Sequence, residues 1–86
     1  MERTGAELPV LIGQTGPLNG TRWVIEHDLM VGRDPSCDVV ISDRQVSRFH
    51  ARFLFSQDGI ILEDLGSKNG TFRNGERLEE PQLLMD

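Results

Sequence analysis

The sequence predicts an all-β domain built as an antiparallel β-sandwich, and three observations lead to this fold class. No segment keeps apolar residues at the i, i+3, i+4, i+7 spacing of an amphipathic helix over a helix length. Short runs of β-branched or aromatic residues follow one another instead. Turn-forming residues separate these runs at intervals of roughly 8 to 12 residues, as they do in sandwiches and barrels.

Four strands are expected in the first half of the chain. The run LPVLI opens the series, and the turn-rich GQTGPLNG separates it from TRWVIE, in which Trp23 and Ile25 share one face. The short run LMVG follows, and RDPSCD breaks the chain before VVI. These strands are expected at residues 8–12, 21–26, 29–32 and 39–41.

The second half is expected to contain a longer strand, a turn and a hairpin. One face of the run FHARFLF should hold Phe49, Ala51, Phe53 and Phe55. The turn SQDG leads into IILEDL, and RNGE indicates a hairpin turn because Asn74 and Gly75 both tolerate positive φ. These strands are expected at residues 49–55, 60–65, 71–72 and 76–78.

Size and composition predict one cytoplasmic domain that spans residues 1–86. The hydrophobic fraction is 37% and the charged fraction is 27%, which is ordinary for a soluble chain. No apolar run approaches the roughly 20 residues of a membrane span. The N-terminal segment also has too short an apolar core for a signal peptide. No membrane partner is expected.

Cys37 is the only cysteine, so it cannot form an intrachain disulfide. A small, buried apolar residue is the expected role for it. A reactive thiol is the alternative.

The charge distribution locates the part of the chain that could hold a cationic site. The net charge is −5 at pH 7, which argues against non-specific binding to nucleic acid or to an anionic membrane. Between Arg33 and Arg77 there are seven basic and seven acidic residues, so the whole negative excess lies in the two ends. A cationic site is therefore expected in the middle of the chain.

An enzyme is the first alternative to weigh, because Ser47 and His50 resemble a nucleophile and its base. On a strand, their separation of three would send the two side chains to opposite faces, and no obvious third group orients the imidazole. His27 and His50 are isolated, and Cys37 has no partner at metal-ligand spacing. The sequence therefore predicts no enzyme, no metal site and no cofactor.

The remaining loop residues suit one doubly charged anion. Arg33 follows Gly32 at the end of an expected strand. Ser47 and Arg48 lie in the next loop, and SKNGT at 67–71 forms a third. A phosphate ester is bound best when a guanidinium fork, a hydroxyl, backbone N–H groups and an ammonium act together. Each residue also has an ordinary structural explanation, as a solvated arginine, a turn cap or an Asn-Gly turn.

The order of these elements resembles the forkhead-associated (FHA) domain. The family's pattern is Gly-Arg, then Ser-Arg-x-His, then Ser-x-Asn-Gly-Thr, then Asn-Gly. The stretch VGRDPSCDVVISDRQVSRFHARF, followed by LEDLGSKNGTFRNG, contains every element in that order. The core motif covers residues 29–78, more than half of the chain. Four motif elements in this order indicate the family far more specifically than any single element does.

The resemblance implies an eleven-stranded β-sandwich that binds phosphothreonine peptides with the loops at one end. The residues implied to contact or surround the phosphate are Arg33, Ser47, Arg48 and Lys68. Asn69 would hydrogen-bond the peptide main chain and fix its register. Arg44 lies just before the Ser-Arg loop and is a candidate for sensing a side chain that flanks the phosphothreonine.

The other motif positions would be structural. His50 would tie the binding loops together rather than act as a base. Asn74 and Gly75 would form a turn distant from the site. The structural set is Gly32, His50, Gly70, Asn74 and Gly75.

The end of the sequence departs from the family pattern. Family members continue with two more strands, and this sequence reaches only EEPQLLMD. A sandwich without its last two strands is therefore expected, with the chain being a fragment or the N-terminal module of a longer protein, or with another chain supplying the strands. Unpaired strand edges would then favour self-association. The segment PQLLMD is expected to be weakly tethered.

The function predicted from these features is a non-catalytic module that recognises phosphothreonine-containing protein segments. Its expected partner is a Thr-phosphorylated protein such as a Ser/Thr kinase or a substrate of one, and not a nucleic acid. The alternative is an FHA-like structural or oligomerisation module that binds partners independently of phosphate. The phosphothreonine-dependent function is favoured, because all four of its expected residues are present, namely Arg33, Ser47, Arg48 and Asn69.

Overall fold

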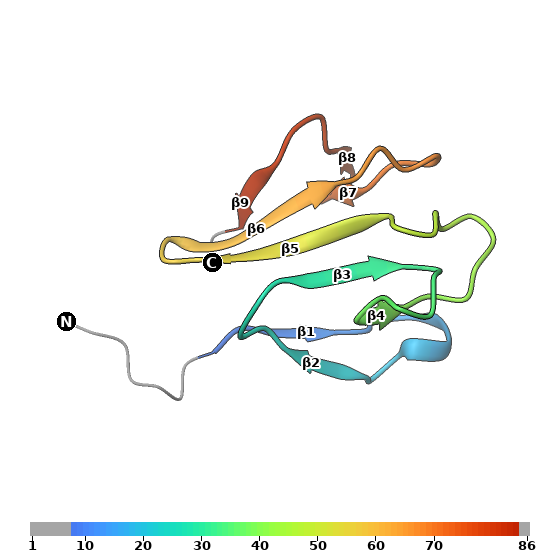
Figure 1. Cartoon of the computed structure of the whole chain (residues 1–86), viewed down its shortest axis with the longest axis horizontal. Helices are drawn as coiled ribbons and strands as arrows, with labels where there is room; N and C mark the ends of the chain where they lie inside the picture. The colour runs from blue at the N-terminus through green and yellow to red at the C-terminus, as the bar shows by residue number, and fades with distance from the viewer. Residues whose placement is uncertain (1–7, 85–86) are drawn as a thin grey trace.

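A five-stranded sheet forms the larger layer of the structure, a computed structural model that describes residues 8–84 (Figure 1). Its strands are β3 (Leu29–Gly32), β4 (Val39–Val40), β5 (Ala51–Ser56), β6 (Gly59–Asp64) and β9 (Gln82–Leu84). The strand order is β4-β3-β5-β6-β9. β5 and β6 form a six-pair hairpin at the centre, which gives the sheet its longest ladder.

Two short hairpins complete the described strands. β1 (Val10–Ile12) pairs with β2 (Arg22–Val24), and β7 (Phe72–Arg73) pairs with β8 (Glu76–Arg77). A three-residue 3₁₀ helix, η1 (Gly16–Leu18), lies between β1 and β2. No helix in residues 8–84 is long and apolar enough to cross a membrane.

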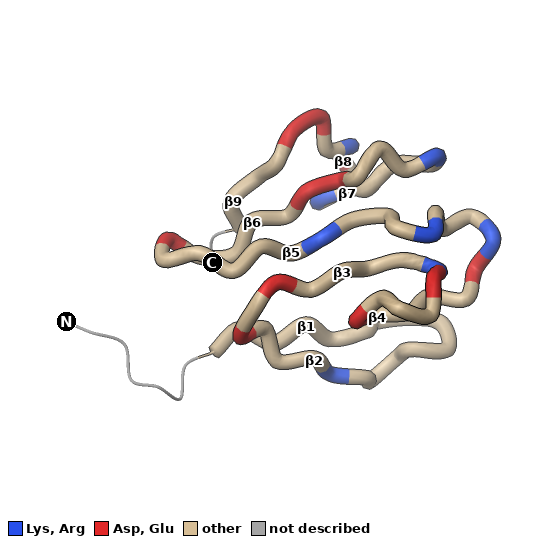
Figure 2. Tube along the Cα trace, in the orientation of Figure 1, with Lys and Arg blue, Asp and Glu red and all other residues tan. Residues whose placement is uncertain are grey.

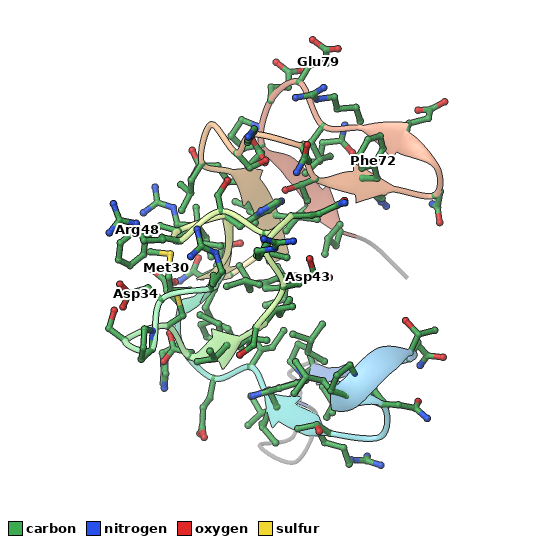
Figure 3. The ribbon with its side chains drawn as sticks, turned by 90° about the vertical axis from the view of Figure 1, so that its right-hand side faces the viewer. Met30, Asp34, Asp43, Arg48, Phe72 and Glu79 are labelled. Carbon is green, nitrogen blue, oxygen red and sulfur yellow. The ribbon has the colours of Figure 1, made fainter. Side chains whose placement is uncertain are left out.

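The core lies between the five-stranded sheet and the β1–β2 hairpin. Ile25, Leu29 and Ile60 form one buried cluster, and Leu11 and Trp23 of the hairpin pack against it. A second cluster consists of Ala51, Leu62 and Leu78. In Figure 3 the β1–β2 hairpin (blue) forms a layer apart from the other strands. Burying each large apolar side chain contributes roughly 1.5 to 3 kcal/mol, so the first cluster holds the β1–β2 layer on the sheet. The second cluster, away from this hairpin, joins β5 and β6 to Leu78.

The all-β prediction is confirmed, since the described residues form strands, turns and one short helix. Cys37 is buried, as the expected structural role requires. The Asn74–Gly75 turn between β7 and β8 also forms, with φ of 52° and 85°. One strand pair departs from the expected antiparallel arrangement, because β4 runs parallel to β3.

The expected apolar face of the 49–55 run is covered at its centre and exposed at both ends. Phe49 is 47% exposed because it lies before Ala51, the first residue of β5. Phe55 is 45% exposed because the pairing of β3 with β5 ends at Leu29 and Phe53, so no residue of β3 pairs opposite it. Phe53, between them, packs on the core.

The sequence analysis does not predict β9, and the expected weak tethering of this segment is wrong for residues 82–84. These residues pair with β6 in the register Ile60↔Leu84, Ile61↔Leu83 and Leu62↔Gln82. Leu84 also packs against both core clusters. Residues 85 and 86 lie outside the described part of the chain.

Candidate functional site

Three loops meet at one end of the five-stranded sheet because its central strands alternate in direction. Val31 of β3 pairs with Ala51 of β5, which pairs in turn with Asp64 of β6. β3 therefore ends where β5 begins and where β6 ends. The loops that extend from these points cover residues 33–38, 41–50 and 65–71, at the right of Figure 1.

Gly32 allows the first two loops to touch along their backbones. It is buried, and a Cβ added to it would lie 2.0 Å from the carbonyl oxygen of Arg48, so no larger residue fits. On one side of this contact, Arg33 N donates to Ser47 O at 3.0 Å. On the other, Asp34 N donates to Arg48 O at 3.1 Å. The Gly-Arg and Ser-Arg elements of the sequence are thus joined directly.

The Arg33 side chain is anchored at one nitrogen only. Its Nε donates to Val46 O at 2.9 Å. Its two terminal nitrogens have no hydrogen-bond partner within residues 8–84, and the residue is exposed. A guanidinium held in this way keeps a pair of donors for an incoming anion.

The His50 ring joins the second loop to the third. Its Nδ1 accepts a hydrogen bond from the backbone N–H of Ser47 at 3.0 Å, so Nε2 carries the proton of the neutral ring. Nε2 is 2.9 Å from Gly70 O, to which it therefore donates. Because both ring nitrogens are used, the imidazole fixes the distance between the two loops.

Two further contacts tie the third loop to the second. Lys68 N donates to Ser47 Oγ at 3.0 Å. Asn69 Nδ2 donates to Gln45 O at 2.7 Å, which leaves Asn69 Oδ1 as an acceptor. The half-buried Ser47 hydroxyl and the exposed Lys68 are therefore neighbours although they are far apart in sequence.

Asp64 organises the third loop, and the sequence analysis did not identify it. Its Oδ1 accepts from Ser67 Oγ at 2.5 Å and from Thr71 Oγ1 at 2.6 Å. Its Oδ2 accepts from the N–H groups of Gly66 and Ser67, both at 3.0 Å. Ser67 Oγ in turn accepts from Gly70 N at 2.9 Å. The signal in the sequence is an aspartate three residues before a serine, a spacing typical of side-chain-capped turns.

The hydrogen bonds at Asp64 decide its charge state. Burial alone would raise the pKa of this carboxyl group. The hydrogen bonds from the Ser67 and Thr71 side chains and from the Ser67 and Gly66 N–H groups together outweigh burial and lower the pKa below its usual value. The carboxylate is therefore ionised at neutral pH and stabilises the conformation of residues 66–71.

Four exposed cations gather at this end of the molecule, namely Arg33, Arg44, Arg48 and Lys68. Figure 2 shows the basic positions on these loops. Figure 3 views the same end, with Arg48 and Asp34 on neighbouring loops. Hydrogen bonds from the Ser36 N–H and hydroxyl, and more weakly the charge of Arg48, lower the pKa of Asp34.

Ser47 and His50 do not form a nucleophile and base pair. His50 Nδ1 accepts from the Ser47 backbone N–H rather than from its hydroxyl, so the ring is not positioned to deprotonate Ser47 Oγ. Burial, with the nearby charge of Asp34, raises the pKa of the Cys37 thiol, which donates to Arg48 O at 3.4 Å. No group of three or more metal-ligating side chains occurs within residues 8–84.

The structure brings most of the predicted site residues together. Those at the loop end are Gly32, Arg33, Arg44, Ser47, Arg48, His50, Lys68, Asn69 and Gly70. Asn74 and Gly75 lie apart from them, in the β7–β8 turn. Gln45 and Asp64 belong to the loop end as well, although neither was predicted. The roles of these residues in binding are taken up below as proposals.

Comparison with known proteins identifies one family. The model of the FHA domain matches residues 29–86. Among curated proteins, the oxoglutarate dehydrogenase inhibitor of Corynebacterium glutamicum is 38% identical over 79 residues, which are 85% of this chain and 55% of that protein. The chain spans about half the length of the curated relatives that it matches.

Solved structures show the same fold. The FHA domain of the CT664 protein from Chlamydia trachomatis has a TM-score of 0.72 at 33% identity, covering 90% of this chain and 77% of that one. The N-terminal FHA domain of Rad53 from Saccharomyces cerevisiae, solved in complex with a phosphothreonine peptide, has a TM-score of 0.62 at 34% identity. That match covers 67% of this chain and 49% of the Rad53 chain.

Proposed function

This chain belongs to the FHA domain family, and we propose that it is a non-catalytic docking module for phosphothreonine-containing segments of other proteins. Arg33, Ser47, Arg48 and Lys68 receive the phosphate, and Asn69 holds the peptide main chain. A Ser/Thr kinase or one of its substrates is the proposed class of partner. Relatives that carry the names of regulators and inhibitors support a binding role rather than catalysis.

The observation that carries this proposal is the cross-linked loop end. Hydrogen bonds of His50 and Ser47 and the close approach at Gly32 join three loops, so the backbones that carry the cations, and the Arg33 side chain at its Nε, are held in place before a ligand arrives. Preorganised donors lose less entropy on binding than mobile ones do. An anion with several oxygens can then contact a guanidinium, a hydroxyl and an ammonium at once.

A titration with phosphorylated and unphosphorylated peptides tests the proposal. A degenerate phosphothreonine peptide pool first selects a sequence, and isothermal calorimetry then measures both forms of it. The expected result is a dissociation constant near 1 μM for the phosphorylated form, equivalent to about −8 kcal/mol, and no measurable binding of the other. Equal binding of the two forms, or none of either, would overturn the proposal.

A second candidate function, association that does not require phosphate, is favoured by the apolar surface of the hairpins. Val10 and Val24 form a cross-strand pair on β1–β2 and are 39% and 48% exposed. Phe72 of the other hairpin is 57% exposed. Within residues 8–84 neither hairpin pairs with a further strand, so each keeps edge N–H and C=O groups available to another chain.

Sedimentation velocity separates this second candidate from the first. Self-association that increases with protein concentration, and that Val24→Lys abolishes, is expected if the hairpin face is the interface. Asp58→Lys, at an exposed position in the β5–β6 turn, is the control for oligomeric state, and the phosphopeptide titration is the control for ligand binding. If the protein sediments as a monomer at every concentration, self-association through this face is excluded.

A further inference from the structure

An open groove lies beside the loops that carry the proposed phosphate site. It has a volume of about 640 Å³, and its lining residues are Ser42, Asp43, Arg44, Gln45, Lys68 and Asn69. The Lys68 N–H that donates to Ser47 Oγ connects the groove directly to the phosphate site. Asn69 Nδ2, bound to Gln45 O, joins its two walls. A peptide chain fixed at the phosphate site would thus have a neighbouring residue within reach of this groove.

The groove contains two cations that no carboxylate neutralises. Arg44 and Lys68 are both exposed, and neither side chain forms an ion pair within residues 8–84. The ion pair described in that part of the chain joins Arg52 to Glu63 on β5 and β6.

The one acidic lining residue already has a structural task. Asp43 Oδ1 accepts from Gln45 N at 2.8 Å, and Asp43 O accepts from Val46 N at 2.9 Å. The carboxylate therefore caps its own turn, while Arg44 and Lys68 have no such partner. The lining thus has a net charge of +1, and Arg44 is the cation in it that is not assigned to the phosphothreonine phosphate.

We propose that this groove selects phosphothreonine peptides that carry a second anionic side chain close to the phosphothreonine. The inference rests on the proposed function and adds to it the class of peptide that is preferred. The second anion is a carboxylate from Asp or Glu, or a second phosphate, because either satisfies a guanidinium and an ammonium together. Arg44 is its main contact, since Arg44 is not shared with the phosphothreonine phosphate.

A positional scan of one phosphothreonine peptide tests the inference. The peptide has alanine at the three positions on each side of the phosphothreonine, and each position is replaced in turn by Glu, phosphoserine, Leu or Lys. At one position, Glu should strengthen binding roughly threefold to tenfold over Ala, equivalent to about 0.6 to 1.4 kcal/mol. Lys should weaken binding there. The phosphoserine arm shows whether a phosphate serves better than a carboxylate.

Variants of Arg44 test whether the gain in affinity from Glu arises in the groove. Arg44→Ala should remove the gain from Glu while leaving the affinity for the all-alanine phosphopeptide within about twofold, and Arg44→Glu should make Lys the preferred residue at that position. Arg22→Ala, an exposed arginine on β2, is the matched control and should preserve the gain.

The outcomes distinguish this inference from the proposed function. Phosphate-dependent binding with no position at which Glu exceeds Ala by twofold would overturn the inference and leave the function standing. If Arg44→Ala weakens every phosphopeptide equally, Arg44 belongs to the phosphate site and the groove is not selective. Absence of phosphate-dependent binding would overturn both.

Discussion

The two ends of the five-stranded sheet are built from the same strands but held together in different ways. At the loop end, hydrogen bonds connect residues far apart in sequence, such as His50 with Gly70 and Asn69 with Gln45. At the opposite end, local contacts accompany one long-range hydrogen bond, which Phe55 N donates to Asp28 Oδ1 at 2.8 Å. Ser56 Oγ donates to Gly59 O at 2.7 Å within the β5–β6 turn, and His27 Nδ1 lies 2.9 Å from Asp28 O.

The two ends also differ in charge. Figure 2 shows basic and acidic positions together on the loops at one end, whereas the charged Asp and Glu residues of the connections at the opposite end, Glu26, Asp28 and Asp58, have no Lys or Arg beside them in sequence. The sheet itself is therefore not what makes a binding site here. The loop end differs in having several long-range cross-links and four exposed cations, and each prediction below alters one feature of one end.

Removing the Arg33 guanidinium should have the largest effect on binding. Hydrogen bonds to charged groups contribute roughly 1.5 to 3 kcal/mol, so Arg33→Ala should weaken phosphopeptide binding by about ten- to a hundredfold or more. Arg33→Lys should retain only part of the parent's affinity for the phosphopeptide, because an ammonium lacks the planar fork of a guanidinium. Calorimetry on folded variants, with Arg22→Ala as control, measures the change. Parent-like affinity of Arg33→Ala would mean that the phosphate lies elsewhere.

Substituting each of the two histidines tests the hydrogen bonds between the loops without changing the Lys and Arg residues of the site. His50→Ala leaves Ser47 N–H and Gly70 C=O without their partner, which costs roughly 1 to 3 kcal/mol of folding free energy. The melting temperature should fall by about 4 to 8 °C per kcal/mol. His27→Ala, at the opposite end, should change stability by less than about 0.5 kcal/mol. Similar melting temperatures for the two variants would contradict the proposed role of His50 in holding the loops together.

The ionised Asp64 should make the stability of the loop end depend on pH. Its pKa is lower in the folded protein than in the unfolded chain, so its charge stabilises the fold above the unfolded value of about 3.9. That contribution is lost as the pH falls through the lower folded value. Urea unfolding should therefore show the advantage of the parent over Asp64→Asn shrinking between pH 6 and pH 3. A difference that stays constant over this range would contradict the assignment.

Reversing a charge at the opposite end should have the smallest effect. The six residues of β5 separate the two ends by about 20 Å, and the Debye length at physiological ionic strength is about 8 Å. Asp58→Lys should therefore change phosphopeptide affinity by less than about twofold at 0.15 M salt. A larger change in calorimetry would show that the two ends are coupled.

The sequence by itself determined the features that depend on local backbone preference and motif order. The turn at Asn74 and Gly75 follows from two residues that accept positive φ, and it forms with φ of 52° and 85°. The order of Arg33, Ser47 and Asn69 between expected strands also placed them on loops. Strict antiparallel alternation would send the consecutive loops after β3 and β4 to opposite ends, so only the family resemblance implied that they meet, and the parallel pairing of β4 with β3 allows it.

Only the tertiary structure decided which distant groups face one another. The β9 strand exists because residues 82–84 meet the edge of β6, and Phe55 is exposed because β3 ends before it. The network at Asp64 and the proton on His50 Nε2 likewise depend on partners brought in by folding. A residue's own φ and ψ preferences act over one or two positions, whereas pairing, burial and hydrogen bonding depend on neighbours that the chain supplies from elsewhere.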